Sequence, residues 1–417
     1  MVRRNSLCYN KLEKNGQALC DKGRKSSGEG CLVNMGTRES QLFFRQNGTA
    51  PLGIIATEGA KELAGRIDAY LVKWAKEAGI EKDTFIIESE CPRFSSGDAK
   101  GLIKSTVRGM DLYFVVDVGN YSIKYNLFGQ PNSMSPDDHF QDLLRLIQAA
   151  GGKAHRLNVI MPMLYGGRQH RRAYRESLDC AFMLQTLRDV GVSNLITFDA
   201  HDPRVMNAVP LMGFDNVMPT YQALKSLFRH VPDLKVDRDH FMIISPDEGA
   251  LNRNMYYASV LRVDLGMFYK RRDYSRIVNG HNPIVAHEYL GSSVEGMDIF
   301  IADDIISSGE SMLDIAVKLK EKGAKRIFGY ATYAIFTNGL ETYDKAYEQG
   351  MIDGVLGSNL TYRTEELKKR EWFFEVDVSK YAAYLVAGMN HDMSFSSVLD
   401  PHEKIAALLE KREQGLV

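Results

Sequence analysis

The sequence predicts an α/β protein with two similar units, each a mostly parallel sheet flanked by helices. From about residue 51, short apolar runs rich in β-branched residues alternate with amphipathic segments of helical period. A strand, an acidic residue, a loop and a helix follow one another three times, at Asp199, Asp247 and Asp303. A chain of 417 residues, 44% of them hydrophobic, is also long enough for two or three domains with real cores.

The composition excludes several classes of partner. Lys plus Arg (52) nearly balances Asp plus Glu (53), so no overall basic field predicts binding to nucleic acid or to an anionic membrane. No apolar stretch approaches the roughly 20 residues that cross a bilayer, and the basic N-terminus lacks the apolar core of a signal peptide. We therefore expect a cytoplasmic protein. Free thiols are predicted because an odd number of cysteines lacks CxxC spacing, namely Cys8, Cys20, Cys31, Cys91 and Cys180.

Three segments are predicted along the chain. Residues 1–50 form a disordered extension, because their polar, Gly- and Lys-rich sequence has no sustained period. A first domain covers 51–218, and the boundary is placed near Val217-Met218-Pro219. A second domain covers 219–417, and whether its last residues pack back on the first domain stays open.

The first domain is predicted to begin with a strand and an amphipathic helix that ends at Gly79, followed by strands over 84–89 and 111–116. Between these two strands, a loop joins an aromatic ring to polar acceptors. It could stack and hydrogen-bond a purine, or Phe94 could simply anchor the loop in the core. The loop consists of Phe94, Ser95, Ser96, Gly97 and Asp98. Residues 121–138 are predicted to be an irregular insertion before a helix over 139–150.

Two further strands of this domain end in polar loops. A strand over 157–164 runs into a basic loop whose guanidinium groups suit polyphosphate oxygens, although a solvated turn is the alternative. Its residues are Arg168, Gln169, Arg171, Arg172 and Arg175. A helix with apolar positions at Leu178, Phe182, Met183 and Leu187 precedes the next strand, 195–198. That strand ends beside His201, which could hold Mg²⁺ or a phosphate, or serve a structural purpose. A short apolar strand is predicted over 209–214.

In the second domain, a strand over 241–244 ends before Asp247, another acid at a strand end. A strand over 265–269 ends in Lys270-Arg271-Arg272-Asp273. The next 25 or so residues are rich in Gly, Asn, His and Ser, and they predict a mobile lid that carries Lys270 and Arg272. An exposed turn is the alternative.

The whole chain is organised around residues 298–319. An apolar strand over 299–302 stops at Asp303 and Asp304, and a helix follows with apolar residues at Met312, Ile315, Ala316 and Leu319. The intervening hydroxyls and backbone N–H groups lie at a helix N-terminus, where the dipole favours an anion. They belong to Ser307, Ser308, Gly309 and Ser311. The two carboxylates suit vicinal sugar hydroxyls or a hydrated cation, so the segment predicts a pentose phosphate site. A capped turn with solvated acids is the alternative.

From about Pro51 onward, the chain resembles the ribose-phosphate diphosphokinase (phosphoribosyl diphosphate synthetase) family. The resemblance depends on an ordered set of motifs: FSSGD, STVRGMD, RQHRR, FDAHD, SPDEG, YKRRD and ADDIISSGES. It implies two phosphoribosyltransferase-like domains, with ATP and ribose 5-phosphate bound between them and Mg²⁺ as cofactor. It also implies a homo-oligomer, a hexamer or another dimer-based assembly, in which the FSSGD-type loop contacts ATP in a neighbouring subunit. The activity implied is transfer of diphosphate from ATP to ribose 5-phosphate, which releases AMP.

The resemblance also assigns roles to individual residues. ATP would be bound by Phe94, Ser96, Gly97, Asp98, Arg168 and Gln169. His201 and Asp247 would hold the metal, and Lys270 and Arg272 would be catalytic. Ribose 5-phosphate would be bound by Arg272, Asp303, Asp304, Ser307, Ser308, Gly309, Glu310 and Ser311. Glu248, Ser307 and Glu310 depart from the usual family pattern and put substrate affinity in question.

Two other functions stay open. A phosphoribosyltransferase would use the same DDxxSSG loop, but it would leave the RQHRR and FDAHD motifs unexplained. A non-catalytic, nucleotide-binding regulatory homologue would not need Lys270, His201 and Asp247. An assay for AMP separates the three.

Overall fold

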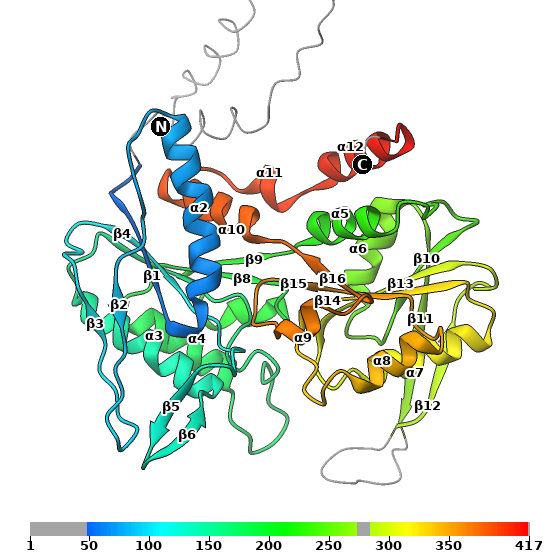
Figure 1. Ribbon diagram of the computed structural model, residues 1–417, viewed down its shortest axis with the longest axis horizontal. Helices are drawn as coiled ribbons and strands as arrows, with labels where there is room; N and C mark the ends of the chain where they lie inside the picture. Colours follow the sequence, from blue (N-terminus) through cyan, green and yellow to red (C-terminus); the bar gives the residue numbers. More distant parts are fainter. Residues whose placement is uncertain (1–47, 273–283, 416–417) are drawn as a thin grey trace, which may run out of the picture.

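The computed structural model describes residues 48–272 and 284–415, which form two sheets covered by helices on both faces (Figure 1). The first sheet has the parallel order β1-β4-β7-β8-β9: Leu52–Ala56 (β1), Asp111–Val115 (β4), Arg156–Ile160 (β7), Asn194–Phe198 (β8) and Gly213–Val217 (β9). The second has the order β12-β11-β10-β13-β14-β15-β16: Phe241–Ser245 (β10), Asp264–Arg272 (β11), Ile284–Leu290 (β12), Asp298–Ile306 (β13), Arg326–Ala334 (β14), Gly354–Ser358 (β15) and Phe373–Val376 (β16). Its pairings are parallel except between β11 and β12. The predicted fold class is confirmed.

Helices connect the strands, as parallel pairing requires. They are η1 (Glu58–Ala60), α2 (Lys61–Glu77), α3 (Pro136–Ala150), α4 (Asp179–Asp189), η2 (Pro203–Ala208), α5 (Thr220–His230), α6 (Leu251–Leu261), α7 (Glu310–Glu321), α8 (Glu341–Glu348), α9 (Glu365–Lys368), α10 (Ser379–Asn390), α11 (Ser396–Leu399) and α12 (His402–Glu413). Two small antiparallel pairs are β2 (Ser89–Glu90) with β3 (Leu102–Ile103) and β5 (Lys124–Leu127) with β6 (Gln130–Ser133).

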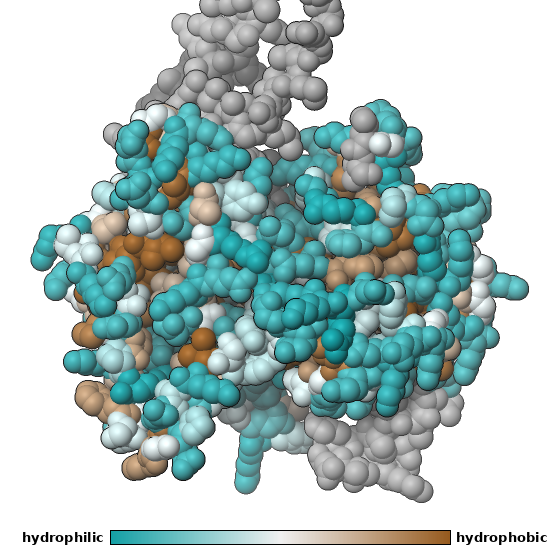
Figure 2. Space-filling view, in the orientation of Figure 1, coloured by the Kyte–Doolittle hydropathy of each residue, from teal (hydrophilic) through white to brown (hydrophobic). Residues whose placement is uncertain are grey.

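One apolar core runs continuously across one face of both sheets. It packs residues such as Ile54 of β1 and Phe300 of β13 against α2, α5, α6 and α10 (Figure 1). The opposite faces have separate cores, one beneath α3 and α4 and one beneath α7 and α8. The face shown in Figure 2 is mostly hydrophilic, with apolar side chains in small separate groups. The shared core therefore fixes the two sheets relative to each other.

The C-terminal segment contributes to this junction, because α10 packs on α2. Asn390 at the end of α10 donates hydrogen bonds to Asp111 Oδ2 (2.9 Å) and to the carbonyl of Ala50 (3.0 Å). Arg156 of β7 binds the same fully buried carboxylate through two nitrogens, each at 2.8 Å. The domain boundary near Val217 itself stays a prediction.

The segment 121–138, predicted to be irregular, is ordered. Most of it is the hairpin of β5 and β6, whose two-residue turn holds Phe128 at φ 47° and Gly129 at φ 78°. Helix α3 then begins at Pro136 rather than at residue 139. The reason is a capping box, in which Ser135 and Asp138 each satisfy the backbone N–H of the other.

Several other sequence-based boundaries were wrong. Of the strand predicted over 84–89, only Ile86 forms a bridge, with Ile54, before β2 begins at Ser89. The strand that begins at residue 156 ends at Ile160, two residues before Pro162, rather than at 164. Residues 209–212 precede the strand predicted there, which covers Gly213–Val217. Phe182, counted among the apolar positions of α4, is 71% exposed.

The predictions of free thiols and of no membrane-spanning segment can be compared with the structure only within the described residues. Cys91 and Cys180 are free, whereas Cys8, Cys20 and Cys31 lie outside the described residues, as does most of the predicted disordered extension. No helix within residues 48–272 and 284–415 has the length and apolarity needed to cross a bilayer.

Candidate active site between the two sheets

The candidate site lies where the two sheets meet. His201 follows β8 of the first sheet, and its Nδ1 lies 2.7 Å from Asp304 Oδ2 on β13 of the second sheet. Asp303 precedes Asp304 on the same strand. Asp247 follows β10, the parallel neighbour of β13, and its charge acts on Asp303. The structure thus brings together four residues predicted from three separate motifs.

Asp303 and Asp304 lie within a strand rather than at its end, which corrects the sequence-based prediction. β13 continues to Ile306 because β14 pairs with it as far as Ile306 opposite Ala334. On the other side, the fully buried Asn254 of α6 donates to the carbonyl of Ala302 (2.7 Å) and accepts from its N–H (3.2 Å). Both carboxylates are therefore held on rigid backbone.

The sequence-based prediction missed Arg253, the cation at the centre of the site. This residue of α6 donates to both oxygens of Asp199 at 2.7–3.1 Å, and its Nη1 lies 3.5 Å from Asp303 Oδ1. Thr332 of β14 donates to the same Asp199 at 2.7 Å. Asp199 is 2% exposed, so it is a buried ion partner and not a ligand for substrate or metal. A charged residue in α6 was visible in the sequence, but its partners were not.

The contacts shift the protonation of these groups. The hydrogen bond with Asp304 raises the pKa of His201 above its ordinary value. Burial alone would raise the pKa of Asp304, but the bond from His201 and the charge of Arg253 lower it. Burial and the neighbouring charge of Asp304 raise the pKa of Asp303. The pKa values of the two adjacent acids are therefore shifted in opposite directions.

The predicted phosphate loop spans Ser307 to Gly309 and leads into α7, which begins at Glu310. Gly309 has φ 84°, and a Cβ there would lie 2.4 Å from the ring of Tyr343, so only glycine fits. Tyr343 also donates to the carbonyl of Gly309 at 3.1 Å. The exposed side chain of Glu310 accepts from Asn338 at 3.4 Å. The loop is held at the N-terminus of a 12-residue helix, as an anion site requires.

The basic loop lies beside His201. The ring of His170 is 5.3 Å from that of His201, and its Nε2 lies 3.5 Å from Asp202 Oδ2. The amide of Gln169 donates to the carbonyl of Ser177 at 2.8 Å, which fastens the loop to its own return segment. Arg168 is exposed. Binding of ATP phosphates by Arg168 and Gln169 stays a prediction.

The Phe94–Asp98 loop occupies another place. Phe94 is 55% exposed, so it is not the buried anchor considered as an alternative. The loop is closed by bonds from Phe94 N–H to Asp98 O (2.7 Å) and from Ser96 Oγ to Asp98 Oδ2 (2.8 Å). The β5–β6 hairpin supports it, because Phe128 N–H donates to Ser95 O at 2.9 Å. The hydrogen bonds of this loop described above are local, and they do not include His201 or Asp303.

Lys270 and Arg272 lie within β11, which extends beyond the predicted strand end at 269. Lys270 pairs through its backbone register with His287 of β12. The segment predicted to be a lid is thus partly a strand, Ile284–Leu290, while residues 273–283 lie outside the described residues.

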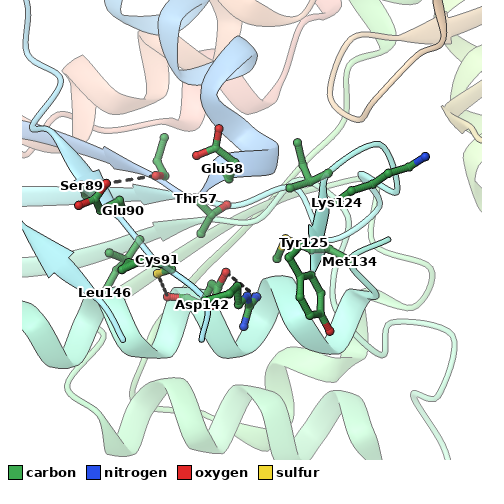
Figure 3. A pocket seen from close by; sticks show the side chains of 14 residues that line it. Thr57, Glu58, Ser89, Glu90, Cys91, Lys124, Tyr125, Met134, Asp142 and Leu146 are labelled. Carbon is green, nitrogen blue, oxygen red and sulfur yellow. Dashed lines mark hydrogen bonds and ion pairs between the residues drawn. The ribbon is translucent and has the colours of Figure 1, made fainter. Parts of the chain in front are cut away.

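A hollow of about 240 Å³ lies away from this site, beneath the β5 strand (Figure 3). Arg93 and Asp142 in its lining form a buried ion pair at 2.9 Å, and the Cys91 thiol bonds the carbonyl of Asp142. None of the predicted site residues lines it. Arg93 and Asp142 thus satisfy each other within the protein, and we assign the hollow no role in the reaction.

The donors at the site fit a magnesium ion that the substrate helps to hold. With Nδ1 of His201 engaged by Asp304, Nε2 is the nitrogen left for a metal. One oxygen of Asp247 accepts from Ala250 N–H at 3.0 Å. In the described part of the chain, no group of three or more His, Cys, Asp or Glu side chains could hold a metal alone. Mg²⁺ typically keeps several waters and takes its other ligands from phosphates, so a site with two protein ligands is compatible with this ion. Metal binding by His201 and Asp247 stays a prediction.

Comparison with known proteins matches both halves of the chain. Residues 52–191 match the N-terminal domain of ribose phosphate pyrophosphokinase, and residues 218–348 match the phosphoribosyl transferase domain. The ribose-phosphate pyrophosphokinase of Vibrio cholerae is 26% identical over 315 residues, 74% of this chain and 90% of the relative. That of Staphylococcus saprophyticus is 24% identical over 351 residues, 84% of this chain and 97% of the relative. The crystal structure of phosphoribosylpyrophosphate synthetase from Mycobacterium smegmatis has the same fold, with a TM-score of 0.66 at 18% identity over 82% of this chain and 99% of that chain.

Proposed function

The chain belongs to the ribose-phosphate pyrophosphokinase family, and from this we propose that it transfers the diphosphoryl group of ATP to the 1-hydroxyl of ribose 5-phosphate. The products are 5-phosphoribosyl 1-diphosphate, a precursor for nucleotide biosynthesis, and AMP. The observation that best supports this reaction is the 2.7 Å contact between His201 and Asp304. This contact joins the end of β8, where we place the nucleotide, to β13, where we place the pentose.

The reaction needs alignment and charge neutralisation more than it needs a reactive side chain. The O1–P bond forms at the β-phosphorus of ATP, the bond from that phosphorus to the α,β-bridging oxygen breaks, and AMP leaves with the bonding electrons. The hydroxyl proton passes to solvent. No covalent intermediate with the protein is required.

Each part of the site has a defined task in this proposal. The Ser307–Ser311 loop holds the 5-phosphate at the N-terminus of α7, and Asp303 accepts hydrogen bonds from ribose hydroxyls. Arg168 and Gln169 bind ATP phosphates, while Lys270 and Arg272 stabilise the transferred group. Mg²⁺, held by His201 and Asp247, supplies neutralising charge to the phosphate oxygens.

The adenine contact completes the proposal. Phe94, Ser96 and Asp98 are exposed, Phe94 to 55%, and Gly97 between them is half-buried. We infer that the protein forms a homo-oligomer in which this loop binds ATP in a neighbouring subunit. We also infer that the protein is located in the cytoplasm. Mixing a Phe94→Ala chain with a Lys270→Ala chain tests this, because only a shared site would restore activity in the mixture.

The direct test is an assay for AMP with purified protein, Mg²⁺, ATP and ribose 5-phosphate. We expect equal amounts of AMP and phosphoribosyl diphosphate. ADP in place of AMP, or no nucleotide product across a range of metal and phosphate concentrations, would refute the proposal. Consumption of phosphoribosyl diphosphate with a nucleobase would instead identify a phosphoribosyltransferase.

Lys270→Ala tests the catalytic assignment. We expect turnover to fall about 10²- to 10³-fold, the usual loss for one preorganised charge donor, while ATP still binds. Lys73→Ala, which removes an exposed lysine of α2, is the matched control and should leave turnover unchanged.

A further inference from the structure

Asp303 and Asp304 are adjacent on β13 and both lie near Arg253, but they differ in exposure and in their other partners. β13 pairs with β14 at Asp303, opposite Ala331, and again at Ile305, opposite Tyr333. The side chain of Asp303 is 28% exposed and that of Asp304 is 9% exposed. Asp303 is therefore the more accessible of the two carboxylates to a ligand.

Both oxygens of Asp304 are directed at cationic or donor groups of the protein. Oδ2 bonds His201 Nδ1 at 2.7 Å, and Oδ1 lies 3.9 Å from Arg253 Nη2. Arg253 is itself fixed by its fork of bonds to Asp199. Asp304 is thus immobilised between a residue of the first sheet and a residue of α6 in the second domain.

The bond defines the chemistry of His201. When Nδ1–H donates to a carboxylate, the tautomer is set and the lone pair lies on Nε2. The His201 side chain is 41% exposed, so the ring is accessible to a ligand. A carboxylate behind an imidazole also strengthens it as a ligand, which is the usual arrangement at metal sites.

We propose that Asp304 is a positioning residue that orients His201 toward the metal, and that Asp303 alone of the pair binds the ribose hydroxyls. Asp303 has an oxygen that accepts the N–H of Asp304 at 2.9 Å, and its more exposed side chain remains available to the sugar. The inference rests on the proposed function, because it names the sugar and the metal–nucleotide complex as the two ligands. In this proposal, Asp303 serves the sugar, and Asp304 serves the metal–nucleotide complex through His201.

Binding measurements on the full chain separate the two roles. Mn²⁺, which is visible by electron paramagnetic resonance, is bound together with α,β-methylene ATP, which cannot be cleaved between its α- and β-phosphates. Ribose 5-phosphate is titrated by calorimetry without nucleotide. Asp304→Asn should weaken Mn²⁺ binding about 10- to 100-fold, the usual loss for a carboxylate behind a metal ligand, and change the dissociation constant for ribose 5-phosphate less than twofold. Asp303→Asn should do the reverse.

A double-mutant cycle shows whether Asp304 acts through His201. In a His201→Gln background, Asp304→Asn should have little further effect on Mn²⁺ binding, because the ring that it orients is gone. Additive losses would overturn the proposal, and so would an Asp304→Asn chain that loses ribose 5-phosphate as strongly as Asp303→Asn does. Neither binding arm requires turnover. An absence of AMP from the unmodified chain would therefore refute the proposed function and leave this inference to be decided by the binding data.

Discussion

Two regions carry the residues expected to contact substrates, and they are held in different ways. Around His201, side chains from both domains hydrogen-bond one another. Arg253 and Thr332 both donate to Asp199, and Asp304 binds His201. The Phe94–Asp98 loop is exposed and is supported by its own backbone and by the β5–β6 hairpin. The first region is built by bringing two domains together, whereas the second is built locally and faces outward. This difference predicts that changes in the first region cost stability, and that changes in the second affect one substrate only.

Arg253→Met should have the largest effect. It leaves Asp199 buried without its cation, and removal of one partner of a buried pair typically costs about 3–5 kcal/mol. We expect a clear fall in the denaturant midpoint of unfolding. Arg204→Met is the matched control, because it removes the same charge from a pair in which the arginine is 79% exposed, and surface pairs contribute about 0–1 kcal/mol. Equal losses in the two variants would contradict the comparison.

Asp117 tests the buried junction through pH. This carboxylate at the end of β4 accepts from Thr361 Oγ1 (2.9 Å) and from Tyr362 N–H (2.9 Å) in the second domain. Burial nevertheless raises its pKa to about 6. The folded chain thus holds this proton more tightly than the unfolded chain, whose pKa is about 3.8. Between these values, the free energy of unfolding should fall as pH rises, on the order of 3 kcal/mol in total.

Asp117→Asn should remove that contribution. The variant keeps an acceptor for Thr361 but does not titrate, so its unfolding midpoint should change less between pH 4 and pH 7 than that of the unmodified chain. Chemical denaturation at several pH values makes the measurement. An identical pH dependence in both chains would show that the pKa of Asp117 is the same in the folded and unfolded protein.

Gly97→Ala should have the smallest effect on stability and a selective effect on binding. Gly97 has φ 95°, and an added Cβ would lie 2.7 Å from Leu127 Cδ1, so the loop must move away from the hairpin. The strain is about 1 kcal/mol, and the melting temperature should fall by only about 2–4 °C. The KM for ATP should rise several-fold, while that for ribose 5-phosphate stays the same.

Phe128→Asn is the control for that variant. Asn followed by Gly is the preferred pair in a two-residue turn with both φ values positive, so the hairpin should keep its shape. We expect no loss of stability and an unchanged KM for ribose 5-phosphate. If Gly97→Ala and Phe128→Asn both raised the KM values for ATP and ribose 5-phosphate together, the loop would not be the independent region described above.

Patterns that depend on neighbouring residues were predictable from the sequence. The strands around Ile54, Phe114 and Ile243 are short and mostly apolar because both faces of a parallel sheet are covered, and such runs are visible in the sequence. The loop that leads into α7 was predictable for the same reason, since its serines, Gly309 and the helix are contiguous, whereas its binding of a phosphate stays a prediction. Ordered motifs of this kind also identified the family. The hairpin of β5 and β6 was missed because its short strands are half-exposed and lack a strong apolar period.

What only the tertiary structure decided is which charges meet. Arg253 and Asp199 are 54 residues apart, and His201 and Asp304 are 103 residues apart, so no local pattern pairs them. The length of β13 also depends on a neighbouring strand. Pairing with β14 continues to Ile306, so the strand extends past two acids at which the sequence predicted its end. The sequence by itself determined which chemical groups the site contains. The packing of the two sheets on a shared core determined that Asp304 meets His201, because this contact joins a residue that follows β8 of the first sheet to a residue of β13 in the second.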